Sequence, residues 1–254
     1  MSTPFSNTTT KAGLIQLCED YCGFSDGDIS GNALLLAKFT SWMNLGLDDI
    51  WGVILQACNL GGLDDNNYTD YPFFSTNLVS GQRDYAYTVD GDGNVILDIS
   101  RVMVASPSGV FAEIYPVNQE TTTSKVGHPV NTDSFIDGKN ASGTPTRYSK
   151  QGGNSILLDV IPNYNSTGGL LMFGNREASY FLTNDTTKKP GFAGIFQNYP
   201  AIFASEIYAG IKTLSNLKKL NTDKVNMRRD VQVYYTSRDK DVSKRMMANR
   251  ESTK

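Results

Sequence analysis

The three cysteines and the single histidine are the most reactive side chains of this 254-residue chain. Cys18 and Cys22 are four residues apart, a spacing that places both on one face of a helix. A structural zinc site needs four ligands, and neither Cys58 nor His128 lies close enough in sequence to complete a cluster. We therefore interpret the cysteines as small buried side chains of a protein kept in a reducing compartment, and we expect no metal and no cofactor.

Carboxylates and histidine give no recognisable catalytic set. Nucleophilic catalysis would have to use His128, and no Gly-x-Ser-x-Gly motif accompanies it. The pairs Asp48–Asp49 and Asp64–Asp65 are adjacent in sequence, so on a helix their side chains do not face each other. We predict no catalytic residue, and we do not expect the chain to be an enzyme.

The segment Asp90–Asn94, followed by Asp98, imitates a calcium-binding loop, because its oxygen-bearing side chains alternate. However, Val95 stands where that loop needs its glycine, and Arg101 stands where it needs a bidentate glutamate. An Asp-Gly-rich hairpin turn explains the segment better.

Composition excludes several classes of protein. Hydrophobic residues make up 39% of the chain and charged residues 19%. A chain of this composition is too aromatic and too weakly charged to be disordered. No apolar run reaches the roughly 20 residues that a membrane helix needs. The first residues lack the basic and apolar regions of a secretory signal. We therefore expect neither a membrane protein nor an exported one.

Charge is distributed unevenly along the chain. Residues 1–100 carry 13 acidic and three basic residues, whereas residues 201–254 carry six acidic and 12 basic residues. Such opposite ends can attract each other within one chain, between neighbouring copies, or through separate partners.

Helical periodicity marks both ends of the chain. Apolar residues recur at helical spacing from Leu14 to Cys22, and Gly23 ends the stripe. A second helix is predicted from Asn32 to Gly46, and a third from about Asp49 to Cys58. Further helices are predicted after Pro200, which suits a first helical turn, and after a cap formed by Thr222 and Asp223.

From about residue 78 the period changes to two, which is typical of strands. Six short strands are predicted, at 85–89, 95–104, 110–114, 155–161, 170–174 and 178–183. The polar stretch 118–153 lacks periodicity, and we expect this long loop to contact a neighbouring subunit or a tail component.

The predicted fold class is α+β, with a helical bundle formed by N- and C-terminal helices and an inserted antiparallel β-sandwich or small β-barrel. The predicted division is an N-terminal helical segment 1–77, a β insertion 78–190, and C-terminal helices with a basic tail, 191–254.

Two short motifs resemble those of the head-to-tail connector proteins (portal adaptors or neck proteins) of tailed bacteriophages. The first is Leu78-Val-Ser-Gly81-Gln-x-x-Tyr85, which follows an acidic and aromatic link containing Asp64-Asp65. The second is Gly143-Thr-Pro145-x-x-Tyr148, which precedes the strand predicted at 155–161. The typical link carries an aromatic residue before the double aspartate, where this chain has Gly61-Gly62-Leu63.

The resemblance implies a virion protein assembled in the bacterial host cytoplasm. In this family a ring of identical subunits, often twelve, docks beneath the portal protein, meets the tail or a second neck protein, and passes double-stranded DNA through its bore. The alternative is a receptor- or glycan-binding β-module of a phage tail, favoured by the Tyr- and Asn-rich sheet and loops.

The basic tail is the predicted interaction segment, and its partner is either an acidic portal or neighbour surface or the phosphates of DNA. Protein docking is favoured, because a dense phosphate track would hold back moving DNA. We expect the tail to be mobile until it docks. The predicted interaction residues are Arg238, Lys240, Lys244, Arg245, Arg250, Lys254 and, in the long loop, His128.

Overall fold

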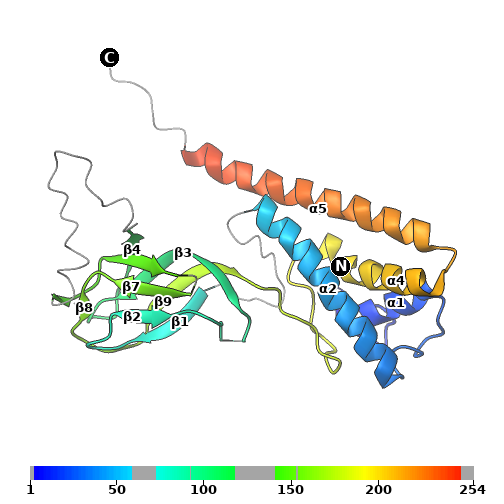
Figure 1. Cartoon of the computed structure of the whole chain (residues 1–254), viewed down its shortest axis with the longest axis horizontal. Coiled ribbons are helices and arrows are strands. Elements are labelled where there is room, and N and C mark those ends of the chain that lie inside the picture. Colours follow the sequence, from blue (N-terminus) through cyan, green and yellow to red (C-terminus); the bar gives the residue numbers. More distant parts are fainter. Residues whose placement is uncertain (1–2, 59–72, 92, 118–140, 153, 247–254) are drawn as a thin grey trace, which may run out of the picture. The chain divides into compact units, whose positions relative to one another are not determined.

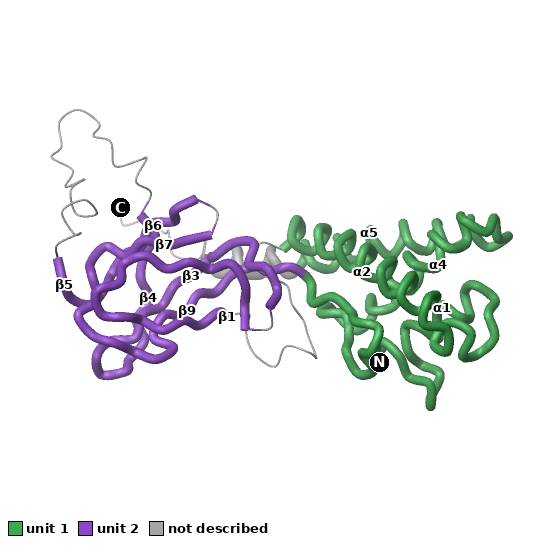
Figure 2. Tube along the Cα trace, turned by 60° about the horizontal axis from the view of Figure 1, so that its bottom comes forward, with its two compact units in different colours: residues 1–69, 178–254 green, residues 70–177 purple. Residues whose placement is uncertain are grey.

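The structure is a computed structural model, and it describes residues 3–58, 73–91, 93–117, 141–152 and 154–246, with side chains as far as residue 237. Its contacts divide the chain into a helical unit, residues 1–69 with 178–254, and a β unit, residues 70–177 (Figure 2). The predicted boundaries lay at 77/78 and 190/191. The difference arises because β1 already begins at Phe73, and because the residues after Glu177 belong with the helices.

Among the described residues, the helical unit contains four α-helices, which come from both ends of the chain (Figure 1). The helix α2 packs against α4 and α5, and α4 also packs against α1 and α5. Their apolar faces share one core that includes Leu14, Phe39, Met43, Tyr199 and Tyr235. The elements are α1 (Leu14–Cys22), α2 (Ala33–Ala57), a 3-10 turn η3 (Gly194–Phe196), α4 (Tyr199–Lys212) and α5 (Leu217–Met246).

Several predicted helix signals are confirmed. Gly23 ends α1 in the left-handed conformation, with φ of 72°. The side chain of Asn32 caps α2 by accepting hydrogen bonds from the backbone N–H groups of Leu34 and Leu35. Pro200 lies in the first turn of α4, as predicted from the preference of proline for that position.

The predicted break at Gly46 is wrong, because α2 continues through it to Ala57. A β-carbon at Gly46 would lie 3.0 Å from Cβ of Phe203, so this glycine permits the close approach of α4.

The predicted cap at Thr222 is also wrong. The last helix begins at Leu217, and Thr222 lies inside it, where its hydroxyl donates to the carbonyl of Lys218. The backbone of α5 remains helical to Met246, into the segment that was predicted to be a mobile tail.

The described strands of the β unit form a curled seven-stranded sheet and a small two-stranded sheet (Figure 1). The strand order of the larger sheet is β1-β9-β3-β4-β6-β7-β2, and the smaller sheet pairs β5 with β8. The strands are β1 (Phe73–Leu78), β2 (Asp84–Ala86), β3 (Ile96–Ala105), β4 (Phe111–Pro116), β5 (Ser142–Gly143), β6 (Arg147–Gln151), β7 (Ser155–Leu158), β8 (Ile161–Pro162) and β9 (Ser166–Arg176).

The core of the β unit lies on one face of the curled sheet. It includes Phe74, Tyr85, Val102, Tyr148 and Met172, which come from five different strands. The α+β class is therefore confirmed. The sheet is not wholly antiparallel, because β4 pairs with β6, and β5 with β8, in parallel. The long connection from Pro116 to Arg147 has the length that a parallel crossover requires.

Two further predictions, a loop and a strand, are wrong. Part of the predicted loop 118–153 forms β5 and β6, while residues 118–140 lie outside the described residues. Residues 178–183, which were predicted as a strand, join no sheet. Phe181 in this segment is instead held by Asn44 of α2, whose amide nitrogen donates to the Phe181 carbonyl and whose amide oxygen accepts from the Phe181 N–H. A side chain thus takes the place of a neighbouring strand.

Candidate functional site

The motif from Leu78 to Tyr85 forms the turn between β1 and β2. Leu78 and Tyr85 are buried at its two ends, and the hydroxyl of Tyr85 accepts from Val79 N at 3.0 Å and donates to Gln82 O at 3.1 Å. Gly81 has φ of +85°, which favours glycine, and its N–H donates to the carbonyl of Pro162 at 2.9 Å. Each fixed position of this motif therefore closes the turn or anchors it.

The second motif, from Gly143 to Tyr148, runs from β5 into β6. Tyr148 is buried in the core of the β unit. Between the motif's fixed positions, Thr146 donates from its backbone N–H and from its hydroxyl to the carboxylate of Asp159, at 3.0 and 2.7 Å. Asp159 is itself buried, and Arg147 lies 3.6 Å from its Oδ2. A buried carboxylate needs such donors.

The two motifs meet although about sixty positions separate them in the chain. Arg83, inside the first motif, donates from Nε to the carbonyl of Leu158 at 2.5 Å and from Nη2 to the carbonyl of Asp159 at 3.3 Å. Asp159 in turn holds Thr146 of the second motif. We call this group of residues, Leu78–Tyr85 with Gly143–Tyr148 and Leu158–Pro162, the motif junction. Arg83 binds backbone carbonyls and Asp159 binds the backbone and side chain of Thr146, so the junction positions strands.

The carboxylate pair Asp48–Asp49 of α2 splits between two separate contacts. Asp49 accepts from the Tyr199 hydroxyl at 2.5 Å and from Arg228 at 2.8 Å, which ties α2 to α4 and α5. Burial, together with the hydrogen bond to Asp49, raises the pKa of Tyr199. Asp48 accepts from the hydroxyl of Tyr180 at 2.6 Å. The two carboxylates therefore do not form an acid–base pair. Asp64 and Asp65 lie outside the described residues.

The segment that imitates a calcium loop is a hairpin turn, as predicted. Val89 and Val95 form an antiparallel bridge across it. The carboxylate of Asp90 accepts from the backbone and side-chain nitrogens of Asn94 and pairs with the guanidinium of Arg176. Burial opposes ionisation of Asp90, but these donors outweigh it and lower its pKa.

The cysteines behave as packing residues in the described part of the chain. Cys18 and Cys58 are buried, Cys22 is partly buried, and all three are free thiols. Burial raises the pKa of Cys22 to about 11 and also raises the pKa of Cys18. Both thiols are therefore protonated at neutral pH and poorly nucleophilic. Among the described residues, no group of three or more His, Cys, Asp or Glu side chains could hold a metal ion.

The predicted interaction residues are only partly placed. Arg238, Lys240, Lys244 and Arg245 lie on the helical backbone of α5, beyond the last described side chain. Arg250, Lys254 and His128 lie outside the described residues. Four of the seven predicted interaction residues therefore lie on the backbone of one helix, α5.

Sequence analysis missed a groove on the helical unit. One face of α2, containing Ala37, Ser41, Asn44 and Leu45, lines about 620 Å³ together with residues 180–184. Leu45 is 51% exposed and Leu182 is 60% exposed. The aliphatic residues on this face of α2 could have indicated the groove. Its opposite wall could not be predicted, because residues 178–183 were assigned to a strand.

None of the protein-family models and none of the curated proteins compared with the chain gives a match. Among the described residues, the helices include none with the length and apolar character needed to cross a membrane.

Proposed function

We propose that the chain is a structural subunit of a tailed-bacteriophage virion, in which identical copies form a ring that connects the portal to the tail. Its partners are further copies of itself, the portal protein and a tail or second neck protein, and double-stranded DNA passes through its bore. It is assembled in the bacterial cytoplasm and acts without enzymatic activity or cofactor.

The motif junction is the observation that carries this proposal. Both motifs on which the resemblance rests belong to it, and Arg83 and Asp159 link them through the strand β7 and the residues that follow it. Chance matches to two short patterns would have no reason to fold into one connected group. The junction therefore strengthens the resemblance as a whole.

The charge of the helical unit suits a repeated contact between copies. Within this unit, residues 1–69 carry eight acidic and two basic residues, and residues 178–254 carry seven acidic and 14 basic residues. Head-to-tail contacts in a ring join two different surfaces of the same chain, and opposite charge guides such surfaces together.

For the finer architecture, we propose a helical bundle that carries the curled sheet as a small β-barrel insertion. The helices would hold the ring together, and the β insertion would present loops to the next component. The predicted contact of residues 118–153 with a neighbouring subunit belongs to this arrangement.

Co-sedimentation with portal rings of the same phage tests the proposal. The purified chain should sediment with the portal, and native mass spectrometry of the complex should give an integral number of copies per portal ring. A chain that stays monomeric at every concentration and does not sediment with the portal would contradict the proposal.

A glycan-binding β-module of a phage tail is the second candidate, and the exposed aromatics of β4 favour it. Tyr115 is 67% exposed and Phe111 is 40% exposed, and sugar rings stack on such side chains. Binding of the isolated chain to host surface glycans, lost in Tyr115→Ala and retained in Tyr180→Ala, would support this candidate over the ring.

A further inference from the structure

The groove between α2 and residues 180–184, which we call the α2 groove, combines exposed leucines with a single charge. Leu45 on one wall is 51% exposed, and Leu182 on the other is 60% exposed. Among the described lining residues, Asp48 is the one charged group. Asp48 is exposed and accepts from the Tyr180 hydroxyl at 2.6 Å, and a carboxylate has further acceptor sites for a second donor.

One side of α5 has the same combination with the opposite charge. Val225 and Val233 are 56% and 65% exposed, and the side chain of Arg229, midway between them, is 70% exposed. The three residues are spaced by four, so they follow one side of the helix. The buried Val231 and Tyr235 lie about half a turn away, on the side that faces the core. We call Val225, Arg229 and Val233 the α5 stripe.

The stability of α5 itself does not explain the stripe. Valine is a poorer helix former than alanine or leucine, because its branched side chain loses rotamer freedom in a helix. Val225 and Val233 also bury little apolar surface within their own copy. Arg229 pairs with the adjacent Asp230 at 3.6 Å, but both side chains are more than half exposed, so this pair contributes little. The stripe therefore offers two apolar side chains and a solvated guanidinium to a partner.

The α2 groove and the α5 stripe match in length and in chemistry. The α2 residues that line the groove span 37–48, or about 16 Å of helix, and the stripe spans about 12 Å from Val225 to Val233. Leu45 and Asp48 are three residues apart on α2, so aliphatic and charged side chains are neighbours on both surfaces. A helix that binds in a groove uses apolar anchors at this kind of spacing, and opposite charges fix its register.

The arrangement of α5 points to a second copy as the source of the stripe. In its own copy, α5 packs against α2 and α4 with the side opposite to the stripe, and it lies along one edge of the helical unit in Figures 1 and 2. One copy therefore cannot fill its own groove with its own stripe. The α2 wall belongs to the acidic residues 1–69 and the stripe to the basic residues 178–254, so these surfaces of two copies attract each other.

We infer that the α5 stripe of one copy docks in the α2 groove of the next copy. Arg229 of one copy pairs with Asp48 of the next, and the two valines pack against Leu45 and Leu182. Two different surfaces of one chain that bind each other join copies head to tail, which gives a ring when the rotation closes. The inference rests on the proposed ring and names the surfaces through which its subunits meet.

A charge exchange tests the inference, with sedimentation velocity and native mass spectrometry of the full chain over a concentration series. The parent chain should self-associate. Arg229→Glu and Asp48→Lys should each weaken self-association by about ten-fold or more, because each brings like charges together. The chain that carries both substitutions should recover to within about three-fold of the parent, since the opposite charges are restored in exchanged positions. Thermal unfolding identifies the variants that are correctly folded.

The apolar contact is tested by Val233→Ser, which does not touch Asp48. It should weaken self-association by about five-fold or more, because the valine loses the apolar surface that docking buries. The matched control is Ile211→Ser, which changes a residue of α4 that is 63% exposed, against 65% for Val233. This control should leave self-association within about two-fold of the parent.

Four results would overturn the inference. They are a parent chain that is monomeric at every concentration, a correctly folded double charge variant that does not recover, equal weakening by Val233→Ser and Ile211→Ser, and rings on the portal that persist in every variant. In the last case copies meet through other surfaces, and the ring proposal stands. If Val233→Ser abolishes sedimentation with the portal but leaves self-association intact, the stripe binds the portal and not a second copy. The ring proposal itself fails when the parent chain neither self-associates nor sediments with the portal.

Discussion

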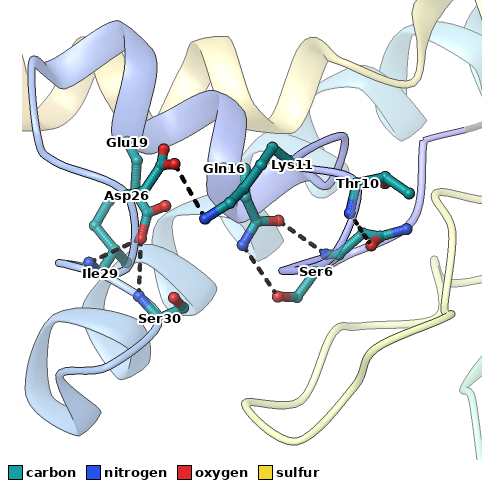
Figure 3. A network of polar contacts seen from close by, with 9 residues as sticks. Ser6, Thr10, Lys11, Gln16, Glu19, Asp26, Ile29 and Ser30 are labelled. Atoms are coloured by element: carbon teal, nitrogen blue, oxygen red, sulfur yellow. Dashed lines mark hydrogen bonds and ion pairs between the residues drawn. The ribbon is translucent and has the colours of Figure 1, made fainter.

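The helical unit and the β unit fix their polar groups in different ways. In the helical unit, side chains hold loops. The half-buried amide of Asn44 binds the backbone of Phe181 in residues 178–183, which we call the strap. The buried carboxylate of Glu19 accepts from the backbone N–H groups of Ile29 and Ser30 at 3.0 Å each (Figure 3). In the β unit, buried carboxylates pair with arginine or with the strand ends, as in Asp90 with Arg176. These groups of the helical unit therefore hold the backbone of loops, whereas in the β unit Asp90 depends on a buried ion pair with an arginine.

The largest effect is expected from breaking the buried ion pair. The side chains of Asp90 and Arg176 are only 4% and 6% exposed. Arg176→Ala leaves the carboxylate buried without its partner, which costs about 3–5 kcal/mol in the free energy of unfolding. Chemical denaturation measures this cost. The control Arg101→Ala removes an exposed pair with Glu113 and should cost about 1 kcal/mol or less. Equal costs for the two variants would show that the β unit does not depend on the buried pair.

A smaller loss is expected at the strap of the helical unit. Asn44→Ala removes both hydrogen bonds to the backbone of Phe181, whose ring is buried. Leaving these backbone groups unpaired costs about 2–3 kcal/mol. The control Ser41→Ala alters the exposed face of the same helix and should change the free energy of unfolding by about 0.5 kcal/mol or less. If Asn44→Ala unfolds like the control, the strap does not depend on that amide.

Two glycines of α2 should respond in opposite directions. Gly46→Ala places a methyl group 3.0 Å from Phe203 and should destabilise the helical unit by about 1–2 kcal/mol. At Gly52 nothing lies within 4 Å of an added β-carbon, so Gly52→Ala should stabilise the unit by about 0.5–1 kcal/mol. Melting temperatures of the two variants give the sign directly. Stabilisation by Gly46→Ala would show that α2 and α4 do not need this close approach.

The smallest effect is expected in acid. Because the pKa of Asp90 lies below its ordinary value of 3.8, ionised Asp90 stabilises the folded β unit at neutral pH. This contribution is complete above the ordinary pKa and disappears as the pH falls through the lower pKa of the folded state. Asp90→Asn should therefore flatten the loss of melting temperature between pH of about 5 and about 2. Parallel melting curves for the parent chain and Asp90→Asn across this range would exclude the effect.

Local signals predicted the elements whose contacts are local. The cap Asn32, the stop Gly23 and the hairpin at Asp90–Asn94 each depend on hydrogen bonds or backbone conformation within a few residues, so the sequence displays them. Gly46 was misread because a glycine that breaks a helix and a glycine that admits a neighbouring helix look identical in sequence. The prediction for residues 178–183 was wrong because an alternating pattern does not show whether the backbone pairs with a strand or with a side chain such as that of Asn44.

The candidate site also combines features that are local in sequence with features that depend on long-range contacts. The motif residues could be located from sequence, and Leu78, Tyr85 and Tyr148 are buried. Their convergence depends on Arg83 reaching the carbonyl of Leu158 and on Asp159 reaching Thr146, and no local pattern encodes these long-range bonds.

Negative-stain electron microscopy of purified virions, labelled with an antibody against this chain, tests the connector proposal most directly. We expect the label at the neck, between the portal vertex and the tail, in rings of fixed copy number. Label confined to the distal tail or its fibres, or absent from intact virions, would contradict the proposal that this chain joins portal to tail.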